Sequence, residues 1–220
     1  MSCKQCVGID LHFDRKYVAK ELQLYHDEGP CKETQLLIDA LIAEGVSDMT
    51  VLDIGGGVGV IQHELLKQGV SSCFSVEAST AYIEVAKEEA ERQGHADSIT
   101  HLHGDFVDLA AELPECDIVT LDRVICCYHD AVGLVERSTK LAKSMYGVVY
   151  PRDNLSTKIG GFFENMSYRI HRESFRFFVH PTKVVDKIVL SKGFERLFYQ
   201  EEGMWQIVVY GRVHPDKKMI

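Results

Sequence analysis

Hydrophobic positions along this chain change their spacing near residue 50. Before that point they recur every three or four residues, which predicts two amphipathic helices over about residues 13–29 and 32–46. The first pattern ends at Gly29-Pro30 and the second at Gly45, residue types that commonly follow a helix. The apolar positions that carry the patterns are Tyr17, Val18, Leu22 and Tyr25, then Leu37, Ile38, Leu41 and Ile42.

From Thr50 onward, short apolar runs alternate with amphipathic stretches. The runs predict strands over residues 51–54, 72–78, 99–105, 117–124 and 146–153, and the stretches predict helices over 60–69, 80–94 and 131–145. Such alternation is typical of a doubly wound, mostly parallel sheet. Residues 194–213 form two further runs around a short acidic turn, which predicts an antiparallel hairpin at the sheet edge. The fold class expected is a Rossmann-like α/β sheet of seven strands with helices at the N-terminus.

The alternation loosens between the fifth strand and the hairpin. Gly160-Gly161 predicts a break there, and a helix over residues 180–194 follows. We therefore expect an N-terminal helical cap over residues 1–47 and a main domain over 48–220, with an insert at about 152–180.

Charge and cysteine usage narrow the function classes. The chain has 33 acidic and 24 basic residues, a formal charge of −9, which disfavours nonspecific nucleic-acid binding. No apolar run reaches the ~18–20 residues of a spanning helix, and the first residues lack the apolar core of a secretory signal. Seven irregularly spaced cysteines favour reduced thiols, so we expect a cytoplasmic protein.

The stretch "TVLDIGGGVGV" places a glycine cluster directly after a strand. The dinucleotide fingerprint G-x-G-x-x-G does not fit, because its third glycine falls on Val60 or Gln62. A P-loop needs Lys-Ser or Lys-Thr after the glycines, and neither follows. The remaining pattern is D-x-G-x-G-x-G, from Asp53 to Gly59, which suits a ligand without a pyrophosphate.

This stretch resembles the first motif of class I S-adenosylmethionine-dependent methyltransferases, and three more motifs follow in that family's order. The resemblance implies S-adenosyl-L-methionine as cofactor, with Glu77 accepting from the ribose hydroxyls. "HGDF" implies Asp105 and Phe106 at the adenine, and "DIVTLDRV" implies residues 121–123 near the methionine end. The cofactor-binding residues expected are Asp53, Gly55, Gly56, Gly57, Gly59, Glu77, Ala78, Asp105, Phe106, Leu121, Asp122 and Arg123.

The acceptor is not specified by these motifs. The Pro-Pro-Tyr signature of nucleic-acid amino methylation does not follow the fourth strand, so we expect a small-molecule acceptor, with oxygen favoured. A protein or RNA acceptor and a non-catalytic cofactor-binding module are the alternatives. His129 is the expected general base, with Tyr128 beside it, because an imidazole titrates near neutrality. The alternative is that His129 merely starts a helix.

In outline the chain is similar to the magnesium protoporphyrin methyltransferase branch, which has an N-terminal helical segment, a His and a Tyr near the fourth strand, and an insert. Here the order is Tyr128-His129, the reverse of that branch. We expect the insert to cover a planar acceptor that carries an acidic group, or else to be an ordinary amphipathic helix. Its aromatic and basic residues are Phe162, Phe163, Phe175, Phe177 and Phe178, and Arg169, Arg172 and Arg176.

Two groups of residues have the chemistry of metal ligands, and each has a simpler interpretation. Asp122, Asp153 and Asn154 resemble the magnesium ligands of catechol-type O-methyltransferases, although Asp-Asn is also a common turn pair. Cys3 and Cys6 have zinc-like spacing, but a tetrahedral site needs four ligands and no second such pair exists. We expect no resident metal.

Overall fold

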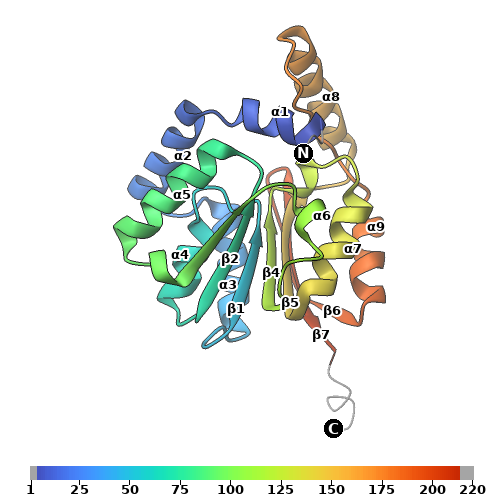
Figure 1. Cartoon of the computed structure of the whole chain (residues 1–220). Helices are drawn as coiled ribbons and strands as arrows, with labels where there is room; N and C mark the ends of the chain where they lie inside the picture. The colour runs from blue at the N-terminus through green and yellow to red at the C-terminus, as the bar shows by residue number, and fades with distance from the viewer. Residues whose placement is uncertain (1–3, 214–220) are drawn as a thin grey trace.

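The sheet has the predicted architecture. The computed structural model describes residues 4–213, and its seven strands run in the order β3-β2-β1-β4-β5-β7-β6 (Figure 1). The first five strands are parallel, and β7 pairs antiparallel with both β5 and β6 at the edge. The strands are β1 Thr50–Ile54, β2 Ser72–Glu77, β3 Ile99–His103, β4 Cys116–Asp122, β5 Ala142–Pro151, β6 Phe194–Glu202 and β7 Trp205–Arg212.

Helices cover both faces because the central strands are apolar on both sides. In β1, Val51 packs on one face, among α3 (Lys32–Ala43), α4 (Val60–Lys67) and α5 (Thr80–Gln93). Its neighbour Leu52 packs on the other face, among α6 (Phe106–Leu109), α7 (Ala131–Leu141) and α9 (Thr182–Ser191). Figure 1 shows the two layers on either side of the sheet. Successive side chains of a strand point to opposite faces, so a continuous apolar run supplies both cores.

Two N-terminal helices lie above the carboxyl ends of the parallel strands. These are α1 (Lys4–His12), which crosses the top of the sheet in Figure 1, and α2 (Arg15–Glu28). Asp14 caps α2 by accepting from the Tyr17 amide at 2.8 Å. Val18 and Tyr25 of α2 pack with Val58 and Tyr82 in a small apolar cluster of their own. By contrast, α3 belongs to the main core.

Two boundaries predicted from sequence are wrong. The helix expected over residues 131–145 ends at Leu141, and β5 begins at Ala142. Ala142 and Met145 are buried in the sheet, where pairing with β4 and β7 outweighs their helix propensity.

The expected break at Gly160-Gly161 is also absent, because α8 (Leu155–Ile170) runs through both residues. A Cβ at Gly161 would come within 3.0 Å of the Phe177 ring, so this glycine allows close packing instead of ending the helix. No helix within residues 4–213 is long and apolar enough to cross a membrane.

Candidate active site

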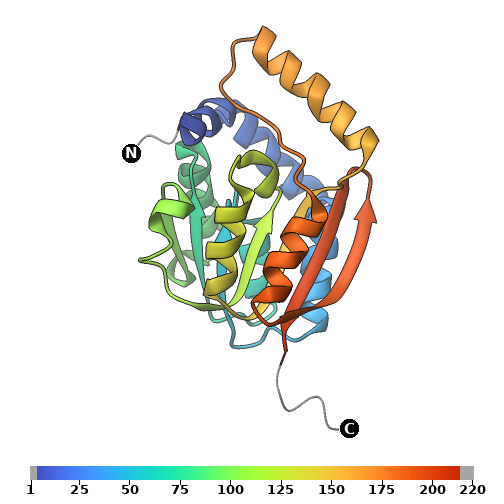
Figure 2. The same cartoon turned by 90° about the vertical axis from the view of Figure 1, so that its right-hand side faces the viewer.

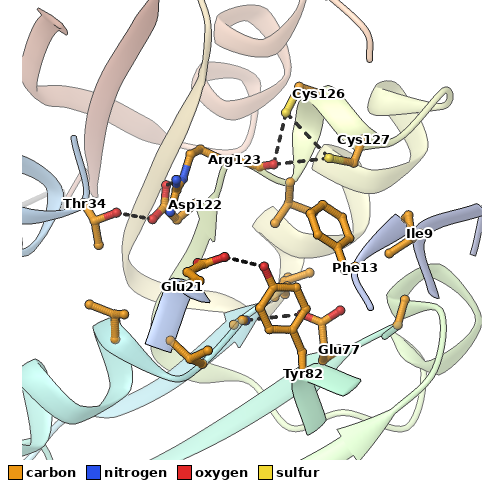
Figure 3. Close-up of a pocket in the computed structure, with 18 of the residues that line it drawn as sticks. Ile9, Phe13, Glu21, Thr34, Glu77, Tyr82, Asp122, Arg123, Cys126 and Cys127 are labelled. Atoms are coloured by element: carbon orange, nitrogen blue, oxygen red, sulfur yellow. Dashed lines mark hydrogen bonds and ion pairs between the residues drawn. The ribbon is translucent and has the colours of Figure 1, made fainter. Parts of the chain in front are cut away.

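A cavity of about 710 Å³ lies at the carboxyl ends of β1 and β4. The strand order reverses between these two strands, which is where open α/β sheets bind ligands. Its lower wall is made by the tips of β1, β2 and β4 and by the loops that follow β1, β2, β3 and β4. Its upper wall comes from α1, α2, α8 and the segment over residues 175–177. Figure 3 shows residues of both walls.

The glycine loop between β1 and α4 is held close against a buried polar cluster. Gly55 has φ of 67°, and a Cβ there would collide with Val124. A Cβ at Gly56 would collide with the Gln62 amide, which donates to Asp53 Oδ2 at 3.0 Å. Asp53 Oδ1 accepts from Thr120 at 2.7 Å, and burial raises the pKa of Asp53 to about 7. Asp53 therefore supports the loop from beneath.

Glu77 ends β2, and its side chain is held by backbone amides. Oε1 accepts from the Ser79 amide at 2.9 Å and Oε2 from the Gly57 amide at 3.2 Å. Burial raises the pKa of Glu77, and these hydrogen bonds oppose the rise. Glu77 and the adjoining Ala78 both line the cavity, so this carboxylate can accept from the hydroxyls of a ligand.

A second carboxylate lies after β3. Asp105 caps α6 through a 2.9 Å bond from the Val107 amide, and Phe106 beside it is buried. The Tyr128 hydroxyl donates to both Asp105 oxygens, at 2.9 and 2.8 Å. All three side chains line the cavity.

The tip of β4 carries an ion pair. Arg123 Nε lies 3.3 Å from Asp122 Oδ1, and the carboxylate of Asp122 raises the pKa of the guanidinium above its ordinary value. Thr34 of α3 donates to Asp122 Oδ2 at 2.5 Å (Figure 3). Arg123 has φ of 59°, a conformation that is uncommon for residues with a Cβ and that concentrates at functional sites.

A histidine of the upper wall is paired with a carboxylate behind it. His12 of α1 stacks on Phe175, with ring centroids 4.3 Å apart and an interplanar angle of 8°. Its Nδ1 lies 2.9 Å from Glu173 Oε2. Tyr168 of α8 contacts both rings edge-on. An imidazole oriented by a carboxylate can accept a proton through its other nitrogen.

Comparison with known proteins agrees with this geometry. Residues 51–150 match the family model described as "Methyltransferase domain". The fold resembles magnesium protoporphyrin IX methyltransferase from Synechocystis PCC 6803, solved with bound SAH. That match has a TM-score of 0.73 and 16% identity, and it covers 95% of this chain and 100% of the other. Residues 51–150 therefore carry a methyltransferase domain of the class I, S-adenosylmethionine-dependent type.

Two further matches show which other proteins this methyltransferase domain resembles. An O-methyltransferase family protein from Burkholderia thailandensis has a TM-score of 0.65 at 15% identity, covering 92% of this chain and 64% of that chain. Protein arginine N-methyltransferase 1 of Saccharomyces cerevisiae is 38% identical over 72 residues. That stretch is 33% of this chain and only 20% of the yeast protein. The neighbours thus include proteins named for different acceptors.

Most of the site residues predicted for the methyltransferase domain line the cavity, but three do not. Leu121 is fully buried in the core, because it alternates with the cavity-facing Asp122 along β4. Gly59 is the N-cap of α4 and faces His63. His129 is exposed and stacks on Tyr128, 5.7 Å between centroids, outside the cavity lining. The predicted cofactor and base roles of these three stay predictions, and we find no cavity contact to support them.

The magnesium interpretation does not fit the donors present. Asp153 pairs with Lys158 at 2.5 Å, and Asn154 accepts from the Thr157 amide as the N-cap of α8. Asp122 is already engaged by Thr34 and Arg123. No three His, Cys, Asp or Glu side chains in the described part of the chain are grouped to hold a metal. Cys3 of the predicted zinc-like pair lies outside the described residues.

The insert contributes fewer residues than predicted. Phe175 and Phe177 line the cavity, whereas Phe178 does not, and Phe162 and Phe163 are exposed on α8. None of the three arginines lines it: Arg169 and Arg172 are exposed, and Arg176 donates to the Glu173 and Phe175 carbonyls at 2.6 and 2.5 Å.

Sequence reasoning missed several residues at the cavity. His12 and Glu173 are 161 positions apart, and no local pattern connects them. The thiols of Cys126 and Cys127 lie 3.7 Å apart beside the Arg123 carbonyl (Figure 3). For α2 the available signal was the helical spacing of Tyr17 and Tyr25, both of which line the cavity.

Proposed function

We propose that this protein transfers a methyl group from S-adenosyl-L-methionine to an oxygen of a small, planar acceptor. The observation that carries the proposal is the composition of the 710 Å³ cavity: carboxylates and the glycine loop form its lower wall, and aromatic rings gather on its upper wall. A volume of this order suits a cofactor together with a small acceptor. The aromatic residues on or beside the upper wall are Phe13, Tyr17, Tyr25, Tyr168, Phe175 and Phe177.

On the lower wall, we propose that Glu77 accepts from the ribose hydroxyls. The amides of Gly57 and Ser79 orient that carboxylate and favour its ionised form against the effect of burial. Phe106 would cover the adenine, and Asp105, braced by Tyr128, would accept from its amine. Asp122 and Arg123 would meet the amino and carboxylate groups of the methionine end.

When bound, the cofactor supplies a methyl group on a positively charged sulfur, which the acceptor atom displaces in line. On the upper wall, the aromatic rings would hold the acceptor flat and exclude water from the reaction. An acidic group on the acceptor would be paired by Lys20 of α2, which lines the cavity, because the insert arginines lie away from it.

We further infer that His12, rather than His129, removes the acceptor proton. Donation of Nδ1–H to Glu173 fixes the tautomer in which Nε2 is the basic nitrogen. His12 lines the cavity and His129 does not. We also propose that the cap consists of α1 and α2 alone, because α3 packs in the main core.

A second candidate is methylation of a basic nitrogen, on a small amine or a protein side chain. Glu21, Glu28 and Glu164 line the cavity, and carboxylates suit a cationic acceptor. Glu21 accepts from Tyr82 at 2.5 Å.

The free thiols fit a reducing compartment, so we propose a cytoplasmic protein.

The test is a turnover assay on purified protein, which measures S-adenosylhomocysteine released with panels of phenols, aromatic carboxylic acids, amines and arginine peptides. The proposal expects turnover with the flat oxygen acceptors. Turnover with amines or peptides alone would favour the second candidate. Cofactor binding by calorimetry without turnover on any panel would support a non-catalytic binding module.

A further inference from the structure

Helix α8 carries an apolar stripe on its outer surface. Six large side chains, each between 40% and 73% exposed, recur three, four or one positions apart and share one helix face. We call them the α8 stripe: Leu155, Ile159, Phe162, Phe163, Met166 and Ile170. In Figures 1 and 2 this helix stands out at the edge of the molecule.

The stripe lies on the side of α8 opposite to its packing face. Thr157 and Gly161 are buried toward the body, and Glu164 and Tyr168 line the cavity. Asn165 exchanges two hydrogen bonds with the Phe177 backbone. The helix therefore packs through small and polar residues and presents its apolar residues to solvent, the reverse of an ordinary surface helix.

The exposed area is large for a monomer. If each large side chain offers about 150–250 Å² when fully exposed, the figure for aromatic residues, the α8 stripe presents roughly 530–890 Å². The largest apolar patch on a typical monomer is ~300–600 Å². Each partner in a standard stable interface contributes ~800 Å². The stripe is thus close to the size that a dimer interface requires.

The stripe is also symmetric along the helix. Its positions pair about a centre between Phe162 and Phe163, so that reversing the helix superposes the pattern on itself. We propose that α8 packs antiparallel against α8 of a second copy of this chain, about a two-fold axis at that centre. Leu155 then meets the partner's Ile170, Ile159 meets the partner's Met166, and Phe162 meets the partner's Phe163. This proposal does not rest on the proposed function.

The positive charges beside the α8 stripe lead to a further expectation. Lys158 and Arg169 lie along the same edge of α8 by helical spacing, and Lys158 is paired with Asp153 at 2.5 Å. In the antiparallel pair, Lys158 comes near the partner's Arg169, so added salt should tighten the dimer by screening. A membrane would use the same positive edge, but it requires no symmetry in the stripe.

The first experiment measures the mass of the full chain by light scattering and sedimentation equilibrium. We expect a dimer of twice the 24.8 kDa chain mass. Phe162→Glu combined with Phe163→Glu should give a monomer with an unchanged circular dichroism spectrum. Leu190→Glu, at an exposed apolar position on α9, is the matched control and should remain dimeric. A wild-type monomer, with or without binding to phosphatidylglycerol vesicles, would overturn the proposal.

The second experiment tests the antiparallel register. Ile159→Glu and Met166→Lys should each shift the chain to monomer, because each places a charge opposite an apolar side chain. Mixed in equal amounts, the two variants should form a heterodimer, since the carboxylate introduced in one copy then faces the ammonium group introduced in the other. A wild-type dimer that both variants leave intact would place the interface elsewhere. Monomeric variants that fail to associate on mixing would refute the register.

Discussion

The two walls of the cavity are built in different ways. The lower wall uses residues between Asp53 and Tyr128, and its carboxylates have hydrogen-bond partners within that span, apart from the Thr34 bond to Asp122. The upper wall joins α1 and α2 to residues 164–177, more than a hundred positions away. The parallel sheet itself brings the residues of the lower wall together, whereas the upper wall forms only when helices far apart in the sequence pack against each other. Cofactor binding and acceptor chemistry should therefore be separable by mutation.

The largest expected effect lies on the upper wall. His12→Gln should lower turnover by about 10²–10⁴-fold, the usual contribution of a general base, because glutamine keeps a donor for Glu173 but cannot take the proton. Cofactor affinity, measured by calorimetry, should stay unchanged. His129→Gln is the matched control, with turnover near wild type. If the two variants behave in the opposite way, the sequence-based assignment of His129 is restored.

The next effect lies on the lower wall. Glu77→Ala should weaken S-adenosyl-L-methionine binding by about 1.5–3 kcal/mol, because a charged hydrogen-bond acceptor for the ribose is lost. Calorimetry measures this directly, and Glu112→Ala, at an exposed acid outside the cavity, is the control. If Glu77→Ala binds S-adenosyl-L-methionine with wild-type affinity, the proposed contact between Glu77 and the ribose is wrong.

A smaller effect is expected where Tyr128 braces Asp105. Tyr128→Phe removes one neutral donor to a carboxylate, so cofactor affinity should fall by about 0.5–1.5 kcal/mol, a few-fold. Turnover at saturating cofactor should change little. A loss of turnover far beyond the loss of affinity would instead support the predicted catalytic role of Tyr128.

The smallest effect concerns metal. A chelator should leave turnover unchanged, because Asp122, Asp153 and Asn154 are engaged by Thr34, Arg123, Lys158 and the start of α8. The assay is turnover with and without EDTA, followed by added Mg²⁺. Inactivation that Mg²⁺ reverses would revive the magnesium interpretation.

The sequence was most informative where a residue's role is local. The glycine turn after β1 and the acid that ends β2 were readable because each lies at the end of an apolar strand, and parallel strand ends meet at one edge. Leu121 was misjudged because membership of a motif does not say to which face a strand residue points. His12 and Glu173 could not be paired at all, since their contact depends on how α1 packs against the insert. The helix break predicted at Gly161 was wrong for a similar reason, because the role of this glycine depends on its packing against Phe177.

The hydrogen bond from the Gly57 amide to Glu77 ties the first loop to the second strand with no ligand involved. Its consequence is thermodynamic. A glycine-rich loop that had to order itself around each incoming molecule would lose conformational entropy on every binding event. Here that loss is incurred once, when the chain folds, and an arriving nucleoside meets a preorganised surface.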